Sequence, residues 1–159
     1  MRWFITHICG EQAVGKVVAV DITRWRSRLP VRRPSDGEIV GWTVSENYDE
    51  SCVDAVNPVG HLLAQSLPVD DAADVLLEQG LSSLSNPVWG RAPVPVLAHT
   101  DLLDPAETWT WRRFLLVQLD DTRVWIRPAY PSWDERRVEL ALHLPIDDVL
   151  VTDPPPGHE

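Results

Sequence analysis

The first part of the chain alternates between apolar and polar residues over short stretches, a pattern typical of β-strands. Residues 3–9 alternate in this way, and residues 16–23 (KVVAVDIT) are rich in β-branched side chains. The short segment between the two predicts a hairpin. Residues 38–45 (EIVGWTVS) predict a third strand.

Two short helices are predicted in the middle of the chain. The first begins at Asn57 and Pro58, which are typical of an N-cap and a first turn, and it ends at Pro68. The second begins at Asp70 as its N-cap and ends at Gly80. The apolar positions at helical spacing are Val59, Leu62, Leu63 and Leu67 in the first helix, and Ala73, Leu76 and Leu77 in the second.

The clearest hairpin of the sequence lies in the second half of the chain. Residues 110–119 and 122–127 predict its two strands, joined by a tight Asp-Asp turn. Pairing Leu119 with Thr122 assigns the side chains to two faces. One face then holds Trp111, Leu115, Val117, Val124 and Ile126, and the other holds Phe114, Leu116 and Trp125 with Arg112, Arg123 and Arg127.

Three further segments predict strands around this hairpin. Residues 94–99 precede it, residues 137–144 alternate strictly after it, and residues 148–152 predict a short edge strand. We therefore expect a single α+β domain over residues 1–152, with a mostly antiparallel sheet of about six to eight strands and the two short helices in the middle of the chain. Residues 153–159 predict a flexible, proline-rich tail.

The composition is typical of a globular protein, since 44% of the 159 residues are hydrophobic and 24% are charged. No apolar run reaches the roughly eighteen residues of a membrane-spanning helix, so no membrane association is expected. Arg outnumbers Lys 13 to 1, a bias typical of a GC-rich, bacterial coding sequence. The cysteines, Cys9 and Cys52, allow at most one disulfide, and the chain begins without a recognisable secretory signal. We expect a cytoplasmic protein with reduced thiols.

The net charge of −10 is divided unevenly along the chain. Residues 1–34 carry seven basic residues against two acids, for a charge of +5. Residues 35–90 carry ten acids and no Arg or Lys, for a charge of −10, and residues 91–159 carry −5. The uninterrupted acidic segment predicts electrostatic attraction to a basic partner.

The basic segment contains a cluster of arginines interleaved with a tryptophan, and we expect it to form an anion-binding or partner-binding loop. Guanidinium groups bind phosphate or carboxylate in a bidentate manner and stack on aromatic rings. The alternative is that the cluster pairs with the acidic segment 35–90 of its own chain. The sequence pI of about 4.8 disfavours nucleic acid as the partner. The candidate residues are Arg24, Trp25, Arg26, Arg28, Arg32 and Arg33.

The signals for catalysis are sparse. Residues 10–16 fit the spacing of a phosphate-binding loop, but Val17 stands where the motif needs Ser or Thr, so a hairpin loop is the better interpretation. His99 and Asp101, near the end of a predicted strand, are the candidate acid–base pair. The alternative for these two is a partly buried histidine beside an ordinary turn residue.

A metal site is not expected. His7, Cys9, Cys52 and His61 are suitable zinc ligands by type, but their spacing matches no zinc module. The acidic residues 46–50 lack the glycine of a calcium loop. We therefore expect neither a metal nor another cofactor.

Several aromatic residues cluster around the predicted hairpin, namely Trp109, Trp111, Trp125, Tyr130 and Trp133. They fill the core or, with arginines nearby, they form an exposed anchor patch of the kind found at protein interfaces.

Two classes of function follow from these features. The leading hypothesis is a non-enzymatic, acidic interaction protein that binds a macromolecular partner, such as an inhibitor, an immunity or antitoxin-like protein, or a subunit of a complex. The alternative is a small enzyme acting on a phosphate- or carboxylate-bearing substrate held by residues 24–33. A third interpretation, contact with nucleic acid through the same residues, requires the acidic segment to face away.

Overall fold

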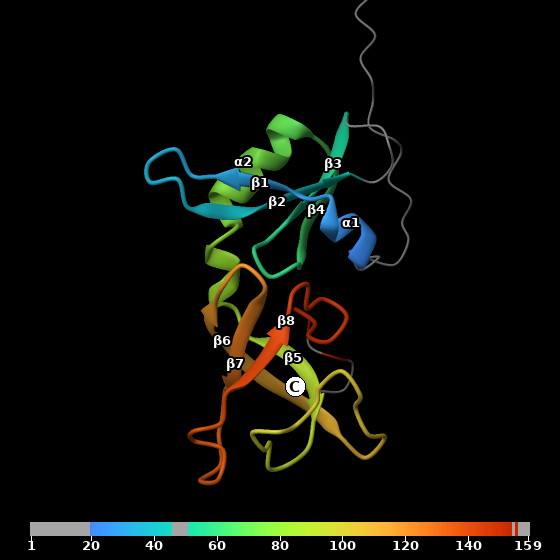
Figure 1. Ribbon diagram of the computed structural model, residues 1–159, viewed down its shortest axis with the longest axis vertical. Helices are drawn as coiled ribbons and strands as arrows, with labels where there is room; N and C mark the ends of the chain where they lie inside the picture. The colour runs from blue at the N-terminus through green and yellow to red at the C-terminus, as the bar shows by residue number, and fades with distance from the viewer. Residues whose placement is uncertain (1–19, 46–50, 154, 156–159) are drawn as a thin grey trace, which may run out of the picture.

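The computed structural model describes residues 20–45, 51–153 and 155, and these form two lobes stacked along the long axis of the molecule (Figure 1). Each lobe contains one antiparallel sheet of four strands. With two short α-helices, the eight strands confirm the expected α+β fold, although the strands form two sheets rather than one. The strand expected over residues 3–9, the phosphate-loop-like segment 10–16 and Cys9 lie outside the described residues.

The first lobe, residues 20–81, is built on the sheet β1-β2-β3-β4. Its strands are β1 (Leu29–Arg32), β2 (Ile39–Ser45), β3 (Cys52–Val56) and β4 (Leu62–Pro68), and its helices are α1 (Ile22–Arg26) and α2 (Val69–Gln79). Helix α2 packs on this sheet and buries Ala72 and Leu76 against Val40, Val53 and Ala55. The strand expected over residues 38–45 is confirmed as β2.

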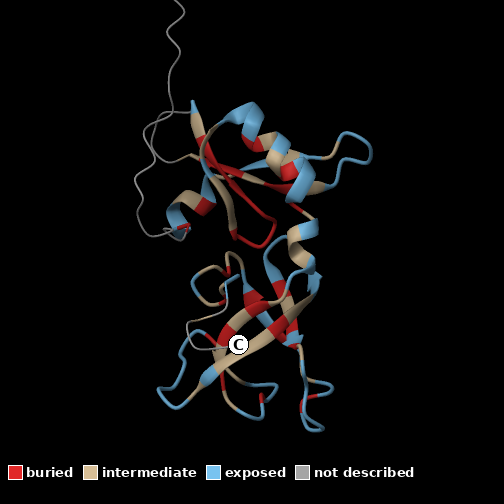
Figure 2. Ribbon diagram, turned by 180° about the vertical axis from the view of Figure 1, so that it is seen from behind, coloured by how far each residue is buried: buried red, intermediate tan, exposed pale blue. Residues whose placement is uncertain are grey.

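The second lobe, residues 82–153, is built on the sheet β5-β6-β7-β8. Its elements are the 3-10 helix η1 (Ser82–Ser85) and the strands β5 (Val88–Ala92), β6 (Thr110–Leu119), β7 (Arg123–Pro128) and β8 (Leu140–His143). The inward face of this sheet forms the largest core cluster, with Phe114, Ile126 and Leu142 among its buried residues. The burial pattern of both cores is visible in Figure 2.

The end of the strand expected over residues 16–23 is wrong, because Ile22 begins helix α1. Asp21 is the N-cap, and its Oδ1 accepts hydrogen bonds from the backbone N–H of Thr23 and Arg24 at 2.8 and 2.9 Å. This cap satisfies two of the unpaired donors of the first turn and outweighs the strand preference of the β-branched residues.

The helix expected from Asn57 to Leu67 is also wrong, because this segment is a turn followed by strand β4. Asn57 does act as a cap, since its Oδ1 accepts from the backbone N–H of Val59 and His61 at 3.2 and 2.9 Å. Gly60, however, has a φ of +106°, a left-handed conformation that ends any helical turn. Pairing with β3 then gives the leucines a strand conformation.

Helix α2 confirms the second predicted helix with a shifted start. It begins at Val69 after Pro68, so Asp70 lies in the first turn instead of capping it, and Gly80 is the C-cap as expected. Leu76 is buried as predicted, but the second buried residue of the helix is Ala72 instead of Ala73, and Leu77 is exposed.

The predicted hairpin of the second lobe is confirmed as β6 and β7, but its register is wrong. Leu119 pairs with Val124 instead of Thr122, and the register shifts between Leu116 and Gln118. The extra residue changes the face of every side chain on one side of the irregularity. Phe114, and not Trp111 or Leu115, therefore shares the buried face with Val124 and Ile126.

The remaining strand predictions of this lobe are only partly confirmed. Residues 137–144 contain β8, with Leu140 and Leu142 buried as expected. Residues 148–152 contribute one bridge, between Val151 and Trp89. The prediction of a strand over residues 94–99 is wrong, because the strand of this region, β5, ends earlier, at Ala92.

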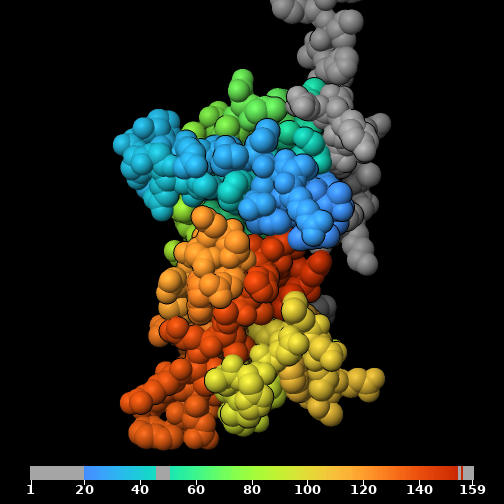
Figure 3. All heavy atoms as spheres, in the orientation of Figure 1, coloured from blue at the N-terminus to red at the C-terminus, as the bar shows by residue number. Residues whose placement is uncertain are grey.

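The two lobes are joined through the turn between β3 and β4. Val59 of this turn belongs to the core of the second lobe, and its carbonyl accepts a hydrogen bond from the Ile146 N–H at 3.1 Å. His61 is buried and its Nε2 donates to the Leu150 carbonyl at 2.7 Å. Burial lowers the pKa of His61, so the ring is neutral at pH 7. Figure 3 shows that the lobes touch over a broad front.

Gly60→Ala is expected to lower the free energy of unfolding by about 3 kcal/mol. A Cβ at this position meets the Pro145 Cβ at 2.4 Å, in addition to the strain of φ +106°. Gly37→Ala is the matched control, because Gly37 also has a positive φ, of +75°, but nothing lies within 4 Å of the added carbon. That variant loses only about 1 kcal/mol. Urea unfolding measures both, and equal losses contradict the packing of Gly60 between the lobes.

Candidate binding face of the second sheet

The arginine cluster of residues 24–33 is a helix and a strand rather than a loop, and part of it is paired with the chain's own acids. Arg24 Nη2 lies 2.6 Å from the Oδ2 of Asp54, which is only 1% exposed. Arg33 Nη2 lies 2.6 Å from Asp36 Oδ2 and 2.5 Å from Glu38 Oε2. These contacts are the self-pairing that the sequence offered as the alternative.

The other residues of the cluster have different surroundings. Trp25 is buried, and Arg28 lies between two rings, with its Cζ 4.2 Å from the Trp25 centroid and 4.3 Å from that of Trp42. Burial lowers the pKa of Arg28. Arg32 Nη1 donates to the Gly37 carbonyl at 2.9 Å, and Arg26 is exposed on α1. Binding of a partner by these residues stays a prediction.

His99 and Asp101 lie in the connection between β5 and β6, and both are exposed. Asp101 Oδ1 accepts from the Leu103 N–H at 2.9 Å, the role of an ordinary turn residue. This connection is at the opposite end of the molecule from α1 and β1 (Figure 1). The fold therefore does not bring the candidate acid–base pair to the arginine cluster.

No group of three or more His, Cys, Asp or Glu within residues 20–45, 51–153 and 155 is arranged to hold a metal ion.

Cys52 is disulfide-bonded, so the expectation of a reduced thiol is wrong at this position. Disulfides are typical of oxidising compartments, and the cytoplasmic location stays a prediction. Among the described helices, none is long and apolar enough to cross a membrane.

The outward face of the second sheet gathers tryptophans and arginines. In β5 the small or apolar Val88, Gly90 and Ala92 are buried, which turns the side chains between them outward. Register places Trp89 opposite Arg113 and Arg91 opposite Trp111, and it continues with Leu115 opposite Arg127. We name this surface the Trp–Arg face, consisting of Trp89, Arg91, Trp111, Arg113, Leu115, Arg123, Trp125 and Arg127.

Sequence reasoning found only part of this face. It named Trp111, Trp125, Arg123 and Arg127 as members of a possible exposed patch, but it divided them between two sides of the hairpin. It missed β5 altogether. The alternation of small and large residues in VWGRA was the signal that would have placed Trp89 and Arg91 outward.

One arginine of the face, Arg91, and its neighbour Arg112 are bound by other groups of the protein itself. Arg91 donates to the backbone carbonyls of Ala106, Glu107 and Trp109 at 2.9–3.3 Å. Arg112 forms a bidentate ion pair with Glu135, with Nη2 3.1 Å from Oε2. Both side chains hold loops in place and are not available to a ligand.

Arg113 has no acidic partner within the part of the chain that the structure describes. Its Cζ lies 4.7 Å from the Trp89 ring centroid and 5.6 Å from that of Tyr130, and Nη1 donates to the Tyr130 hydroxyl at 3.2 Å. The exposed Arg127 likewise forms no ion pair among the described residues. Arg123 lies 5.0 Å over Trp125 and 3.6 Å from an Asp120 carboxylate oxygen.

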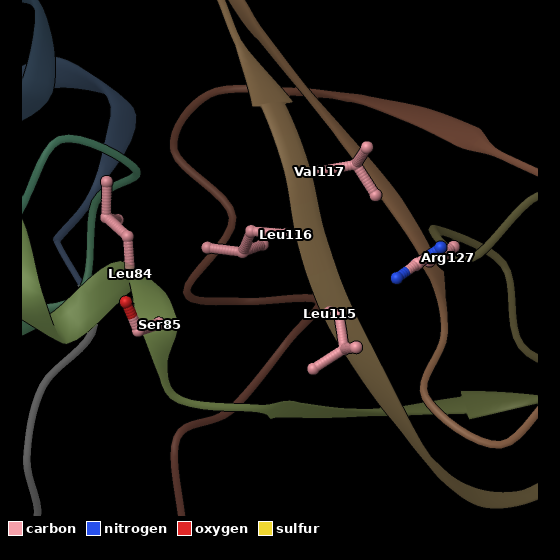
Figure 4. A pocket seen from close by; sticks show the side chains of 6 residues that line it. All are labelled: Leu84, Ser85, Leu115, Leu116, Val117 and Arg127. Atoms are coloured by element: carbon pink, nitrogen blue, oxygen red, sulfur yellow. The ribbon is translucent and has the colours of Figure 1, made fainter.

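Two shallow depressions lie along this surface. One, of about 450 Å³, is lined by Trp89, Val94, Thr110, Trp111, Arg112, Arg113 and Tyr130. The other, of about 390 Å³, lies between η1 and β6 and is lined by Leu84, Ser85, Leu115, Leu116, Val117 and Arg127. In Figure 4, Leu116 points toward Leu84, whereas Val117 lies on the other side of β6.

Glu135 fixes the loops that border the larger depression. It is 1% exposed, and besides Arg112 it accepts hydrogen bonds from the backbone N–H of Val96 at 2.7 Å and of Ser132 at 2.8 Å. The Arg112 guanidinium and these N–H groups lower its pKa from 4.5 to about 2. Glu135 thus links three segments, namely the loop after β5, the loop after β7 and strand β6.

The chain matches no protein-family model, and no curated protein or solved structure matches it either. Function is therefore inferred from the geometry of the described residues alone.

Glu135→Gln is expected to lower the free energy of unfolding at pH 7 by about 3 kcal/mol, because it leaves the Arg112 guanidinium without its counter-charge. In the parent protein this contribution is complete above pH 4.5 and is lost as the pH falls toward the folded-state pKa of about 2. The two proteins should therefore converge in stability between pH 4.5 and 2 in urea unfolding. Asp36→Asn, which removes an exposed ion pair, is the control with a much smaller change. A constant difference across this pH range contradicts the assignment.

Proposed function

We propose that the protein is a non-enzymatic interaction protein and that its partner, another protein, docks on the Trp–Arg face. The observation that carries the proposal is the composition of this surface. The Trp–Arg face contains four Arg and no Asp or Glu, in a chain of net charge −10, and of these four only Arg91 is bonded to backbone carbonyls among the described residues. Three tryptophans lie between these arginines. Trp, Tyr and Arg are the residues most enriched among those that dominate binding energy at protein interfaces.

The flanking residues support the same function. Tyr130 and Val94 line the larger depression and are 75% and 71% exposed. Val117, beside the smaller depression, is 45% exposed. Large apolar side chains gathered on one surface, with arginines around them, are typical of a docking site and not of an isolated monomer surface.

The basic partner that the sequence predicts has a more restricted surface. Asp36, Glu38 and Asp54 are paired with arginines of the same chain. Within the described part of the acidic segment 35–90, the exposed acids that form no ion pair lie on helix α2 and are Asp70, Asp71, Asp74 and Glu78. A basic partner is thus proposed for α2 alone. The Trp–Arg face, which carries arginines, requires an acidic partner surface.

The enzyme alternative has less support. Its substrate-holding arginines and its acid–base pair lie in different lobes. Neither depression contains a histidine or a carboxylate among its lining residues.

Arg127→Glu is expected to remove a bound protein partner without unfolding the chain, because Arg127 is an exposed residue of the face and the substitution reverses its charge. The measurement is native mass spectrometry of the protein purified gently from its own host. The parent chain should carry a protein partner in a fixed stoichiometry, and the variant should lose it. Arg137→Glu, the same change at an exposed arginine outside the face, should retain it.

Two results contradict this proposal. One is a partner that remains bound to the Arg127→Glu variant. The other is a parent chain that carries a phosphorylated or carboxylated small molecule and no protein, which favours the enzyme alternative.

A further inference from the structure

Arg113 is held in a fixed position with most of its hydrogen-bonding capacity unused. The guanidinium lies against Trp89 and Tyr130, and one Nη1 N–H is bonded to the tyrosine hydroxyl. Within the part of the chain that the structure describes, the Nε atom is buried without a hydrogen-bond partner. An arginine has five N–H donors, so the second N–H of Nη1 and both of Nη2 have no partner among the described residues.

Arginines elsewhere in the molecule show two ways of accommodating a partly buried guanidinium. Arg24 and Arg112 each receive a carboxylate and a backbone carbonyl, from Asp54 and Ser45 and from Glu135 and Pro93. Arg91 is bonded to backbone carbonyls instead, and Arg28 stacks on two tryptophans and donates to the Trp25 carbonyl. Removing a guanidinium from water without a counter-charge is unfavourable, and a carboxylate restores the balance with a bidentate, charge-assisted contact. Arg113 lacks this carboxylate among the residues that the structure describes, and it lines a depression of about 450 Å³.

Resting on the function proposed above, we propose that this depression binds an acidic segment of the partner protein. A Glu or Asp side chain contacts the terminal nitrogens of Arg113, and a neighbouring apolar side chain packs on Trp111 and the exposed Val94. Charge complementarity carries this choice of partner, since Arg113 lines the depression without an ion pair among the described residues and no acid is among the lining residues. The apolar part of the lining excludes a simple anion site.

The stacked arginines make a nucleic acid a poorer occupant. A base needs a bare ring face for stacking. The guanidinium of Arg113 lies over Trp89, and that of Arg123 lies over Trp125, so these rings are already covered on one face. A guanidinium that stacks on a ring keeps its N–H donors in its own plane, and these donors match a carboxylate.

The test is a titration of the full-length, ¹⁵N-labelled protein with an acetylated, amidated pentapeptide of sequence Glu-Leu-Glu-Leu-Glu. The indole N–H signals, assigned through single Trp→Phe variants, report on the face. The signals of Trp89 and Trp111 should shift in a saturable manner. Arg113→Gln should weaken binding about tenfold, because it removes a hydrogen-bonded charge pair.

Two further variants separate binding from folding. Tyr130→Phe removes only the hydroxyl that positions Arg113, at a residue that is 75% exposed, and should weaken binding about two- to threefold. Arg136→Gln is the matched control, since Arg136 also stacks on a tryptophan, with its Cζ 4.5 Å from the Trp133 ring, outside the depression. It should bind the peptide like the parent chain.

The proposal is overturned if the peptide causes no saturable shift, or if the Arg113→Gln and parent chains bind it equally. It is also overturned if an eight-nucleotide oligothymidylate or sodium glutarate shifts the same signals and the peptide does not. A partner that dissociates from the Arg127→Glu variant in the mass-spectrometry experiment, together with a silent titration, leaves the interaction function standing and refutes only the acidic segment.

Discussion

The architecture depends on burying the turn that joins β3 and β4. A buried turn must satisfy its backbone polar groups without water, and here the rest of the molecule provides the partners. Asn57 Oδ1 accepts from two N–H groups inside the turn, and Asn57 Nδ2 donates to Ser83 Oγ at 3.0 Å. The Val59 carbonyl accepts a hydrogen bond from the Ile146 N–H, and His61 Nε2 donates to the Leu150 carbonyl. Because the turn carries Val59 into the second core, the second sheet does not complete its core without the first lobe.

This arrangement determines which surface of the second sheet is available. The Val59 turn, the segment after β8 and Leu84 close the inward side of the sheet, so its apolar residues are buried there. Beyond that core the sheet has only its outward face left, and this face carries the tryptophans and arginines. The free-energy cost of half-burying an arginine is reduced where the guanidinium lies over the negative face of an aromatic ring, as that of Arg113 lies over Trp89. Stacking therefore fixes the guanidinium without neutralising its charge, and the charge remains available for recognition.

Much of the fold was accessible from the sequence where a single periodicity decided the outcome. The alternation of residues 137–144 and of the β6–β7 hairpin has one interpretation, and the structure contains both. Asn57, Pro58 and the leucines that follow fit a capped helix as well as a turn and a strand, and only pairing with β3 separates the two. The irregularity between Leu116 and Gln118 has no signature in the alternation, so the faces of the hairpin could not be assigned. The self-pairing of Arg24 and Arg33 followed from charge alone, whereas the Trp89–Arg113 contact depends on the β5–β6 register, which is non-local.

Net charge is a poor guide to what this surface binds. At physiological ionic strength the field of an exposed charge is screened over about 8 Å. The exposed acids of α2 belong to the first lobe, and the second lobe carries further exposed acids such as Asp101, Asp121 and Asp134. The Trp–Arg face itself contains no acid, so a segment in contact with this face meets the arginines. The value of −10 describes long-range repulsion, which slows the approach of any acidic protein without preventing its contact with Arg113. Discrimination between a carboxylate and a phosphate backbone must then come from geometry at short range. Here the covered rings and the in-plane N–H donors of Arg113 favour the carboxylate.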